Sequence, residues 1–325
     1  MPDILKLIRI KNLLIIAATQ YLMRYAVIAS FLNYRGYNLE FGHFNFFLLV
    51  LTTLLIAAAG YVINDYFDTK TDILNRPQSI IVGKTISRQT AMILHVVLNL
   101  LGLLLGFYIS YAVGIWKLVY IYIMITGLLW FYSSAFKRQF LIGNIIVALL
   151  VAIVPLMPAL YEVAQLNEIY RKGLILLHTN FNGIFHWIAG FSVFAFLTNL
   201  IREIIKDTED FEGDKAYGRR SIPVISGIKR TKTVIISLIG LSTVLLILSW
   251  IFFVRIKMEI PILQWVSALY FLIAILLPFA LVAIKVIKAE EKEDWTLASK
   301  LAKWVMLFGI LFALIIRFSY DALQV

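Results

Sequence analysis

Long apolar runs constrain the fold of this chain more than any other feature of its sequence. A helix that crosses a bilayer needs roughly 20 apolar residues. Nine such runs occur in the chain, covering residues 13–32, 46–63, 91–110, 115–134, 141–160, 184–201, 233–254, 262–284 and 305–322. Hydrophobic residues make up 61% of the sequence, and the alternating pattern of a transmembrane β-barrel is absent. We therefore predict an all-α, multi-pass membrane protein with nine transmembrane helices.

Two aspartate motifs with the same spacing stand out against this apolar background. Both have the pattern D-x-x-D-x-x-x-D, one at the end of the second run and one after the sixth. They comprise Asp65, Asp68 and Asp72, and Asp207, Asp210 and Asp214. Offsets of 3 and 7 place the three carboxylates of a set on one face of a helix. Each aspartate would cost about 2.5–3.5 kcal/mol in lipid, so we expect both motifs either to line a wet, cation-filled site or to lie above the membrane.

The basic residues indicate how the chain is oriented. The formal net charge is +11, and most Lys and Arg residues fall in the N-terminal segment and in the loops on the same side of the membrane. By the positive-inside rule, this distribution places the N-terminus and both aspartate motifs in the cytoplasm. The charge excess is therefore explained by topology, with attraction to anionic membrane lipids as a second contribution, and nucleic-acid binding is not predicted.

Pairs of basic residues lie on the same predicted side as the motifs. They are Lys84 and Arg88, Lys137 and Arg138, and Arg219 and Arg220. They could neutralise phosphate oxygens, although ordinary topology signals would look the same. Arg24, inside the first run, could either pair with a structural partner or face a substrate pocket.

Several kinds of chemistry find no support in the sequence. The chain has no cysteine, which excludes disulfides, thiolate metal sites and cysteine nucleophiles. It also lacks a Gly-rich phosphate loop after a strand, an HExxH motif and a catalytic-triad pattern. Clustered carboxylates with nearby cations instead suit Mg²⁺, which binds through a few carboxylates together with substrate phosphates.

These residues give the chain a resemblance to the UbiA superfamily of intramembrane prenyltransferases. The family pattern, N-D-x-x-D-x-x-x-D after the second span and a second Asp motif after the sixth, is matched by Asn64 with the first motif and by the second motif. The resemblance covers the whole chain. It implies one domain, residues 1–325, whose halves of about 1–140 and 141–325 surround a central cavity.

The resemblance also implies a reaction and a set of roles. Mg²⁺ held by the six aspartates would bind a polyprenyl diphosphate, whose prenyl group then passes to an acceptor. Catalytic roles are implied for Asn64, Asp65, Asp68, Asp207 and Lys137, the last from a family Tyr-x-x-x-x-Lys-Arg stretch that begins at Tyr132. Substrate contacts are expected from Tyr61, Tyr132, Lys84, Arg88, Arg138, Arg219 and Arg220.

One departure from the family bears on the acceptor. Many members follow the first motif with an R-P-x-R-P loop, but here Arg76-Pro77 is followed by Gln78-Ser79-Ile80. This variant, with the run from Arg202 to Asp214, is similar to the geranylgeranylglycerol-phosphate geranylgeranyltransferase branch. We therefore expect geranylgeranylglyceryl phosphate as acceptor. An aromatic quinone precursor such as 4-hydroxybenzoate or dihydroxynaphthoate is the alternative, and a divalent-cation transporter is the non-enzymatic one. The oligomeric state stays open.

Overall fold

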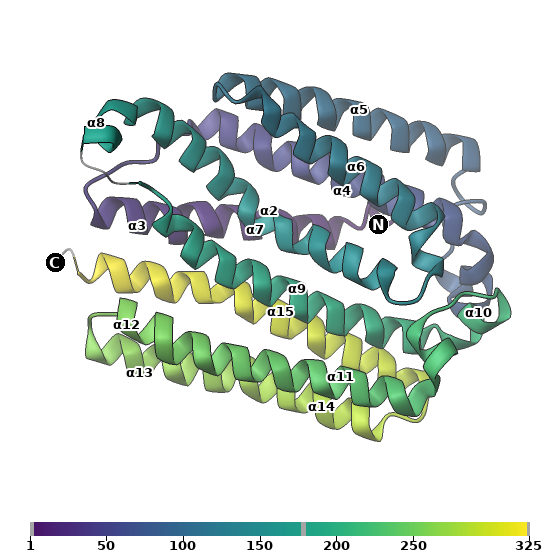
Figure 1. Ribbon diagram of the computed structural model, residues 1–325. Coiled ribbons are helices and arrows are strands. Elements are labelled where there is room, and N and C mark those ends of the chain that lie inside the picture. Colours follow the sequence, from purple (N-terminus) through teal and green to yellow (C-terminus); the bar gives the residue numbers. More distant parts are fainter. Residues whose placement is uncertain (1–2, 177–179, 324–325) are drawn as a thin grey trace.

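The computed structural model describes residues 3–176 and 180–323, and most of them lie in helices (Figure 1). Within this part of the chain, the nearest approach to a strand is one isolated bridge between Val82 and Ile86. The described residues contain nine segments long and apolar enough to cross a membrane, namely Ile10–Tyr34, His43–Asn75, Arg88–Ala112, Trp116–Ser134, Ile142–Ile169, Gly183–Glu209, Ile222–Lys257, Pro261–Lys288 and Lys292–Asp321. The predicted all-α membrane fold is confirmed, and all the helical segments except Trp116–Ser134 extend beyond their apolar runs at one end or both.

Short helices and turns join or interrupt these segments. The first half contains α1 (Asp3–Leu7), α2 (Ile10–Leu22), η1 (Met23–Ile28), α3 (Ala29–Tyr34), α4 (His43–Asn75), η2 (Pro77–Ser79), α5 (Arg88–Ala112), η3 (Trp116–Leu118), α6 (Val119–Ser134) and η4 (Phe136–Arg138). The second half contains α7 (Ile142–Ile169), α8 (Arg171–Leu176), α9 (Gly183–Glu209), α10 (Phe211–Ala216), α11 (Ile222–Ser249), η5 (Trp250–Val254), α12 (Arg255–Lys257), α13 (Pro261–Tyr270), η6 (Phe271–Leu276), α14 (Leu277–Lys288) and α15 (Lys292–Asp321).

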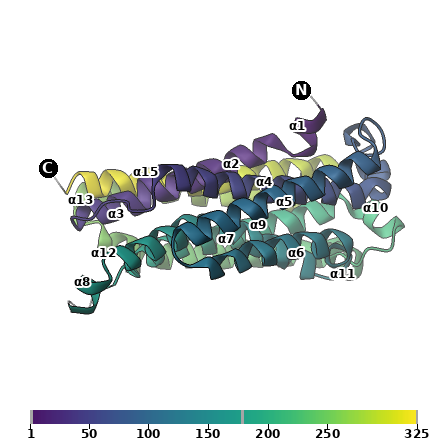
Figure 2. The same ribbon diagram turned by 90° about the horizontal axis from the view of Figure 1, so that it is seen from above.

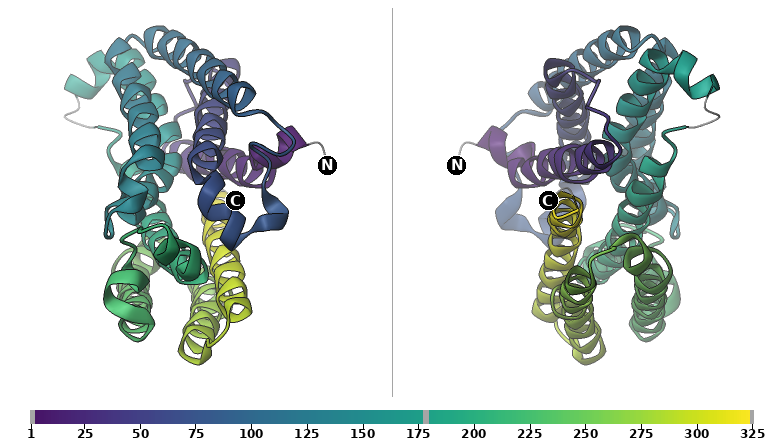
Figure 3. Two further views of the ribbon diagram at one scale, coloured as in Figure 1. Left: turned by 90° about the vertical axis from the view of Figure 1, so that its right-hand side faces the viewer. Right: turned by 90° about the vertical axis from the view of Figure 1, so that its left-hand side faces the viewer.

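Pairs of neighbouring long helices build the bundle. Helix α4 packs on α5, α7 packs on α9, and α9 also contacts α11 and α15. The long helices run along a common direction, with α10 at one end of the molecule and α8 at the other (Figures 1 and 2). Figure 3 looks roughly along this direction and shows the helices standing side by side. We call the end that carries α10 the motif end, because both aspartate motifs lie there.

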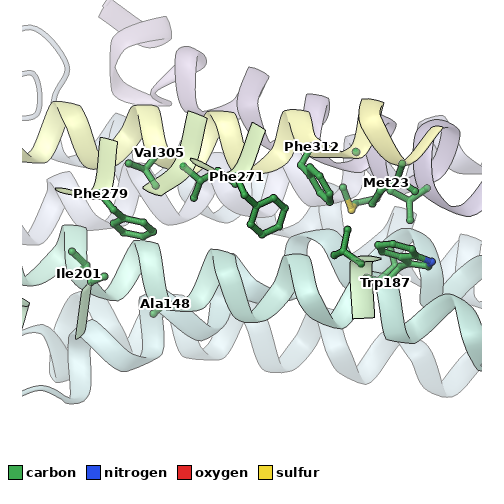
Figure 4. Close-up of a cluster of buried hydrophobic side chains, with 14 of the residues drawn as sticks. Met23, Ala148, Trp187, Ile201, Phe271, Phe279, Val305 and Phe312 are labelled. Carbon is green, nitrogen blue, oxygen red and sulfur yellow. The ribbon is translucent and has the colours of Figure 1, made fainter. Parts of the chain in front are cut away.

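The largest buried cluster joins the two halves of the chain. Side chains of η6, α14 and α15, among them Phe271, Phe279 and Phe312, lie in one cluster with Trp187 of α9 and Met23 of η1 (Figure 4). Helix α15 comes so close to α9 that a Cβ at Gly309 would overlap the ring of Phe194. Small residues that allow such close approach are typical of helix packing in membranes, where van der Waals contact drives association.

Many large apolar side chains lie on the outside of the bundle. Examples are Leu104 and Phe107 of α5, and Phe252, Trp265 and Leu272 of the segments from η5 to η6. In a soluble protein such a surface would favour aggregation. Here it is the surface that faces the hydrocarbon of the membrane.

Arg24 has a structural partner, which decides between the two alternatives left open by the sequence. Its side chain is 1% exposed and lies in the π-helical segment η1. One guanidinium nitrogen lies 3.7 Å from the carboxylate of Glu162 in α7, which is also 1% exposed, and donates a hydrogen bond to the carbonyl oxygen of Phe41. Glu162 in turn accepts hydrogen bonds from the backbone N–H groups of Glu40 and Phe41, at 2.6 and 3.0 Å. The pair thus fixes the segment that leads into α4.

Candidate active site

The first aspartate motif lies on an unbroken helix, as the sequence predicts. Helix α4 continues past the apolar run to Asn75, so Asn64, Asp65, Asp68 and Asp72 all lie on its last turns. Asp68 is buried. A single rigid helix therefore fixes the spacing of these side chains at the motif end.

The second motif does not lie on one helix, and the expectation of a continuous acidic face is wrong here. Helix α9 ends at Glu209, and Asp210, with φ −95° and ψ 11°, joins it to α10, which carries Asp214. The break accompanies a close contact with α4. The backbone N–H of Gly213 donates to Oδ1 of Asn75 at 3.0 Å, and a Cβ at position 213 would overlap that side chain. Glycine thus lets the second motif approach the end of the first.

Two basic side chains contact the aspartate motifs, and one of them, Arg219, bridges both. Nζ of Lys137, in η4, donates to Oδ1 of Asn64 at 3.1 Å and to a carboxylate oxygen of Asp68. Arg219 donates to the other oxygen of Asp68 at 2.5 Å and to Oδ1 of Asp214 at 3.3 Å. Of the six predicted basic contacts, these two lie among the carboxylates.

Two further arginines at the site were not assigned a role by the sequence analysis. Arg9 adopts a left-handed conformation, φ 52°, between α1 and α2 and donates to Oδ1 of Asp65 at 2.7 Å. Arg76, directly after α4, contacts both carboxylate oxygens of Asp210 at 3.1 Å and lies 3.3 Å from Glu209. Arg9 resembles an ordinary topology signal, but the position of Arg76 four residues after Asp72 could have indicated its role.

Asn144 is another polar partner at the site, and no sequence pattern assigned it a role. It lies in the first turn of α7 and donates from Nδ2 to a carboxylate oxygen of Asp207 at 2.8 Å. This hydrogen bond orients the one motif aspartate that stands on α9.

The charges outside the spanning segments influence one another strongly. Burial by itself lowers the pKa of Lys137, but the Asp68 carboxylate and the other neighbours outweigh it, and the pKa lies above its ordinary value. Arg219 shows the same balance, because Asp68 and Asp214 raise its pKa against the effect of burial. Burial raises the pKa of Asp214, and Arg219 opposes that shift. Both basic groups therefore stay charged at neutral pH.

A cavity of about 190 Å³ lies beside this network. Its apolar part is formed by α2, α4, α6 and α7, which contribute Ile16, Ile56, Ala57, Tyr122, Ile125, Leu129, Val147, Leu150, Val151, Ile153, Val154 and Met157. Its polar part lies toward the motif end and contains Arg9, Asn12, Tyr61, Asn64, Tyr132, Lys137, Asn199, Arg202, Glu203 and Lys206. The cavity can therefore take a molecule with an apolar tail and an anionic head.

A smaller, acidic pocket adjoins the polar part. It is lined by Asp207, Asp210 and Asp214 together with Asn144, Arg219 and other polar groups. Tyr132, Lys137, Glu203 and Lys206 line both spaces. The second aspartate motif thus stands next to the mouth of an apolar cavity.

Four predicted substrate contacts do not reach these spaces. Lys84, Arg88, Arg138 and Arg220 are exposed and are not among the residues that line either space. Arg88 donates to Oγ1 of Thr69 at 3.1 Å and lies over the ring of Tyr66, at 4.2 Å from its centroid. Tyr61 and Tyr132 line the cavity, and their contact with substrate stays a prediction.

The donor set suits Mg²⁺, although it is not assembled as a complete cage. Among the described residues, no group of three or more Asp, Glu or His side chains is close enough to hold a metal ion. Asp68 and Asp214 share Arg219, and Asp65 and Asp210 pair with other arginines. Mg²⁺ binds through one or two carboxylates and completes its coordination shell with water and substrate phosphates. The separated carboxylates of the two motifs therefore suit a Mg²⁺ ion that also binds the phosphate oxygens of a substrate.

Comparison with protein families agrees with the geometry. The model of the UbiA prenyltransferase family matches residues 23–307. The chain belongs to the UbiA prenyltransferase family. The match includes both aspartate motifs, the seven spanning segments from His43–Asn75 to Pro261–Lys288 completely, and about half of the first and of the last segment.

Two curated relatives of the chain share one name. The chain is 32% identical over 190 residues to digeranylgeranylglyceryl phosphate synthase of Methanothermobacter thermautotrophicus, covering 58% of this chain and 59% of that protein. It is 29% identical over 269 residues to the protein of the same name from Korarchaeum cryptofilum, covering 81% and 83%. The chain thus spans about six tenths of the length of the first relative and more of the second.

Solved structures of UbiA proteins share the fold. One described as digeranylgeranylglyceryl phosphate synthase superposes with a TM-score of 0.59 at 25% identity, covering 96% of this chain and 98% of that one. A UbiA homologue from Archaeoglobus fulgidus, described as bound to GPP and Mg²⁺, gives a TM-score of 0.53 at 16% identity over 96% and 99%. The second likeness concerns the fold alone.

Proposed function

We propose that this UbiA protein transfers a polyprenyl group from a prenyl diphosphate to geranylgeranylglyceryl phosphate, with Mg²⁺ as cofactor. The observation that carries the proposal is the junction of an apolar cavity with the acidic pocket, through Tyr132, Lys137, Glu203 and Lys206. A prenyl chain in the apolar part would place its diphosphate at this junction. The apolar wall would also keep water away from the reacting carbon.

The aspartates would hold the cofactor. We assign Asp65, Asp68 and Asp72 on α4, and Asp207, Asp210 and Asp214 on α9 and α10, as its ligands through carboxylate oxygens. When bound, Mg²⁺ would neutralise the negative charge on the diphosphate oxygens and favour departure of the diphosphate from the prenyl group. Each half of the single domain contributes one motif, so the site requires both halves.

The remaining side chains would act on the diphosphate. Lys137 and Arg219 now pair with Asp68, and they can donate to diphosphate oxygens while charge builds up there. Asn64 orients Lys137. In the reaction the allylic C1–O bond ionises, and the acceptor hydroxyl oxygen then bonds to the carbocation at C1. The diphosphate leaves with the electron pair, and the hydroxyl proton is released.

The names of the relatives support the choice of acceptor. The curated relatives cited above are digeranylgeranylglyceryl phosphate synthases. A phosphomonoester carries more negative charge than the single carboxylate of 4-hydroxybenzoate or dihydroxynaphthoate, and the two further cations of the cavity, Arg202 and Lys206, suit it. The positive-inside rule further favours a cytoplasmic motif end in the cell membrane.

The test is a transfer assay with purified protein in detergent. Geranylgeranyl diphosphate and Mg²⁺ are supplied with geranylgeranylglyceryl phosphate, 4-hydroxybenzoate or dihydroxynaphthoate, and labelled product is measured. We expect product with the glyceryl phosphate alone and none with EDTA. An aromatic product would refute the acceptor, and Mg²⁺ uptake into liposomes without any transfer would favour a transporter.

Substitutions in the motifs test the metal assignment. We expect Asp65→Ala and Asp207→Ala to reduce turnover by at least about 10²–10³-fold, as for the loss of other transition-state charge stabilisers. The helical circular dichroism and thermal midpoint should stay close to those of the unmodified protein. Turnover at the original rate in either variant would refute the assignment.

A further inference from the structure

The polar part of the cavity carries more positive charge than the metal site explains. Among the described residues that line it, Arg9, Lys137, Arg202 and Lys206 are basic, and Glu203 is the one carboxylate. Arg9 and Lys137 already pair with Asp65 and Asp68 of the first motif. Arg202 and Lys206 are left to share Glu203.

The contacts among Arg202, Glu203 and Lys206 leave a hydrogen-bond donor available for an anionic ligand. Nη1 of Arg202 lies 2.8 Å from Glu203, and Nζ of Lys206 lies 3.7 Å from it, so two cations face one carboxylate. Nε of Arg202 is buried and has no hydrogen-bond partner among the described residues. A buried donor without a partner is costly, and an anionic ligand could accept its hydrogen bond. The side chains of Arg202 and Lys206 are each 22% exposed, so a ligand can reach them.

Lys303 adds positive charge next to the polar part of the cavity. Nζ of Lys303 in α15 donates to Oδ1 of Asn12 at 2.8 Å, and Asn12 lines the cavity. The charge of Lys303 also interacts with those of Arg202 and Lys11. The region between α2, α9 and α15 is therefore positive.

One turn of α9 separates this region from the acidic pocket. Arg202 lines the cavity alone, Asp207 lines the acidic pocket alone, and Lys206 lines both. A divalent cation with its diphosphate is favoured on the acidic side, where carboxylates can neutralise it. An anion without a metal is favoured on the side of Arg202, where the guanidinium offers paired donors to a phosphate group.

We propose that Arg202 and Lys206 form the binding site for the phosphomonoester of the acceptor, separate from the metal-bound diphosphate. The inference rests on the proposed transfer reaction and assigns a second anion site to it. It also explains how the protein can hold two phosphorylated substrates without forcing their charges together.

The experiment compares two acceptors that differ only in the phosphate. Geranylgeranylglyceryl phosphate and geranylgeranylglycerol are assayed at fixed geranylgeranyl diphosphate with the unmodified protein, Arg202→Gln and Lys206→Gln. We expect each substitution to raise KM for the phosphorylated acceptor by about 10- to 100-fold, the effect of losing a charged hydrogen bond. In Arg202→Gln, whose residue lines the cavity but not the acidic pocket, KM for the donor and for geranylgeranylglycerol should change less than about threefold. Lys300→Gln removes an exposed cation of α15 and serves as the matched control.

Binding without catalysis keeps this test independent of the proposed reaction. In EDTA and without donor, we expect the unmodified protein to bind the phosphorylated lipid more tightly than the alcohol, and inorganic phosphate to compete. Arg202→Gln should lose this preference, and Arg202→Lys should recover part of it. A raised KM for the donor, or equal losses for both acceptors, would overturn the inference. Failure of transfer alone, with the binding preference intact, would refute only the reaction.

Discussion

The two ends of the bundle both contain arginine–carboxylate pairs, but in very different settings. Away from the motif end, Arg24 and Glu162 are each 1% exposed and also bond to the backbone that leads into α4. At the motif end, Arg9 and Asp65 are 35% and 19% exposed, and Arg9 lines a cavity. An arginine–carboxylate pair therefore stabilises the fold away from the motif end, whereas at the motif end such a pair stays accessible to a ligand.

This difference has an energetic reason. A pair sealed from water cannot exchange partners without leaving a buried charge, so it suits a permanent structural contact. A pair closer to water loses less when it opens, so Arg9 can exchange the carboxylate of Asp65 for a phosphate at modest cost. Exposure, more than residue type, distinguishes the Arg24–Glu162 pair from the Arg9–Asp65 pair.

The largest expected effect comes from breaking the sealed pair. Arg24→Ala leaves the charge of Glu162 buried, and we expect a loss of about 3–5 kcal/mol in stability. The thermal midpoint of the purified protein in detergent measures the change. Adding Glu162→Gln should recover part of it, because the amide oxygen can still accept from Glu40 and Phe41 and no charge is stranded. An unchanged thermal midpoint in Arg24→Ala would show that the buried pair does not stabilise the fold, and would refute its assignment as a structural contact.

A smaller effect is expected at the contact that joins the motifs. Gly213→Ala places a methyl group against Asn75, and such overpacking costs typically about 1–3 kcal/mol. We expect a higher Mg²⁺ requirement for turnover, because α10 and Asp214 must shift away from α4. Asn75→Ala makes room for the methyl group, so the double variant should be closer to the unmodified protein than additivity of the single effects allows. Strictly additive effects would show that this contact does not position the motif.

The sequence predicts the outline of the fold because lipid imposes strong rules. Runs of sufficient length must become helices, so the nine spans could be predicted, and the first motif simply continues the second span. The break at Asp210 could not be predicted from spacing. It depends on Gly213 meeting Asn75, a contact between residues far apart in the chain.

The candidate site could be predicted only in part, for a similar reason. Spacing identified the aspartates, and the family pattern pointed to Lys137. Neither spacing nor the family pattern could distinguish Arg219, which reaches Asp68, from Arg220, which is exposed. Arg9 and Arg202 had to be found from the cavity they line, because a cation near the membrane looks the same in sequence whether it signals topology or binds a ligand.

The smallest effect is expected in the loop after the first motif, where sequence alone suggested phosphate contacts. Lys84 is exposed and lies outside both the cavity and the acidic pocket, so we expect Lys84→Gln to change KM for donor and acceptor by less than about twofold. Arg88→Gln should lower the thermal midpoint slightly, because Arg88 loses its contact with Tyr66, but should leave both KM values in the same range. Lys137→Gln is the positive comparison, with a clearly raised KM for the donor. A tenfold rise in KM for the donor in Lys84→Gln would mean that the loop closes over the bound diphosphate. The motif end would then reach its final structure only when substrate binds.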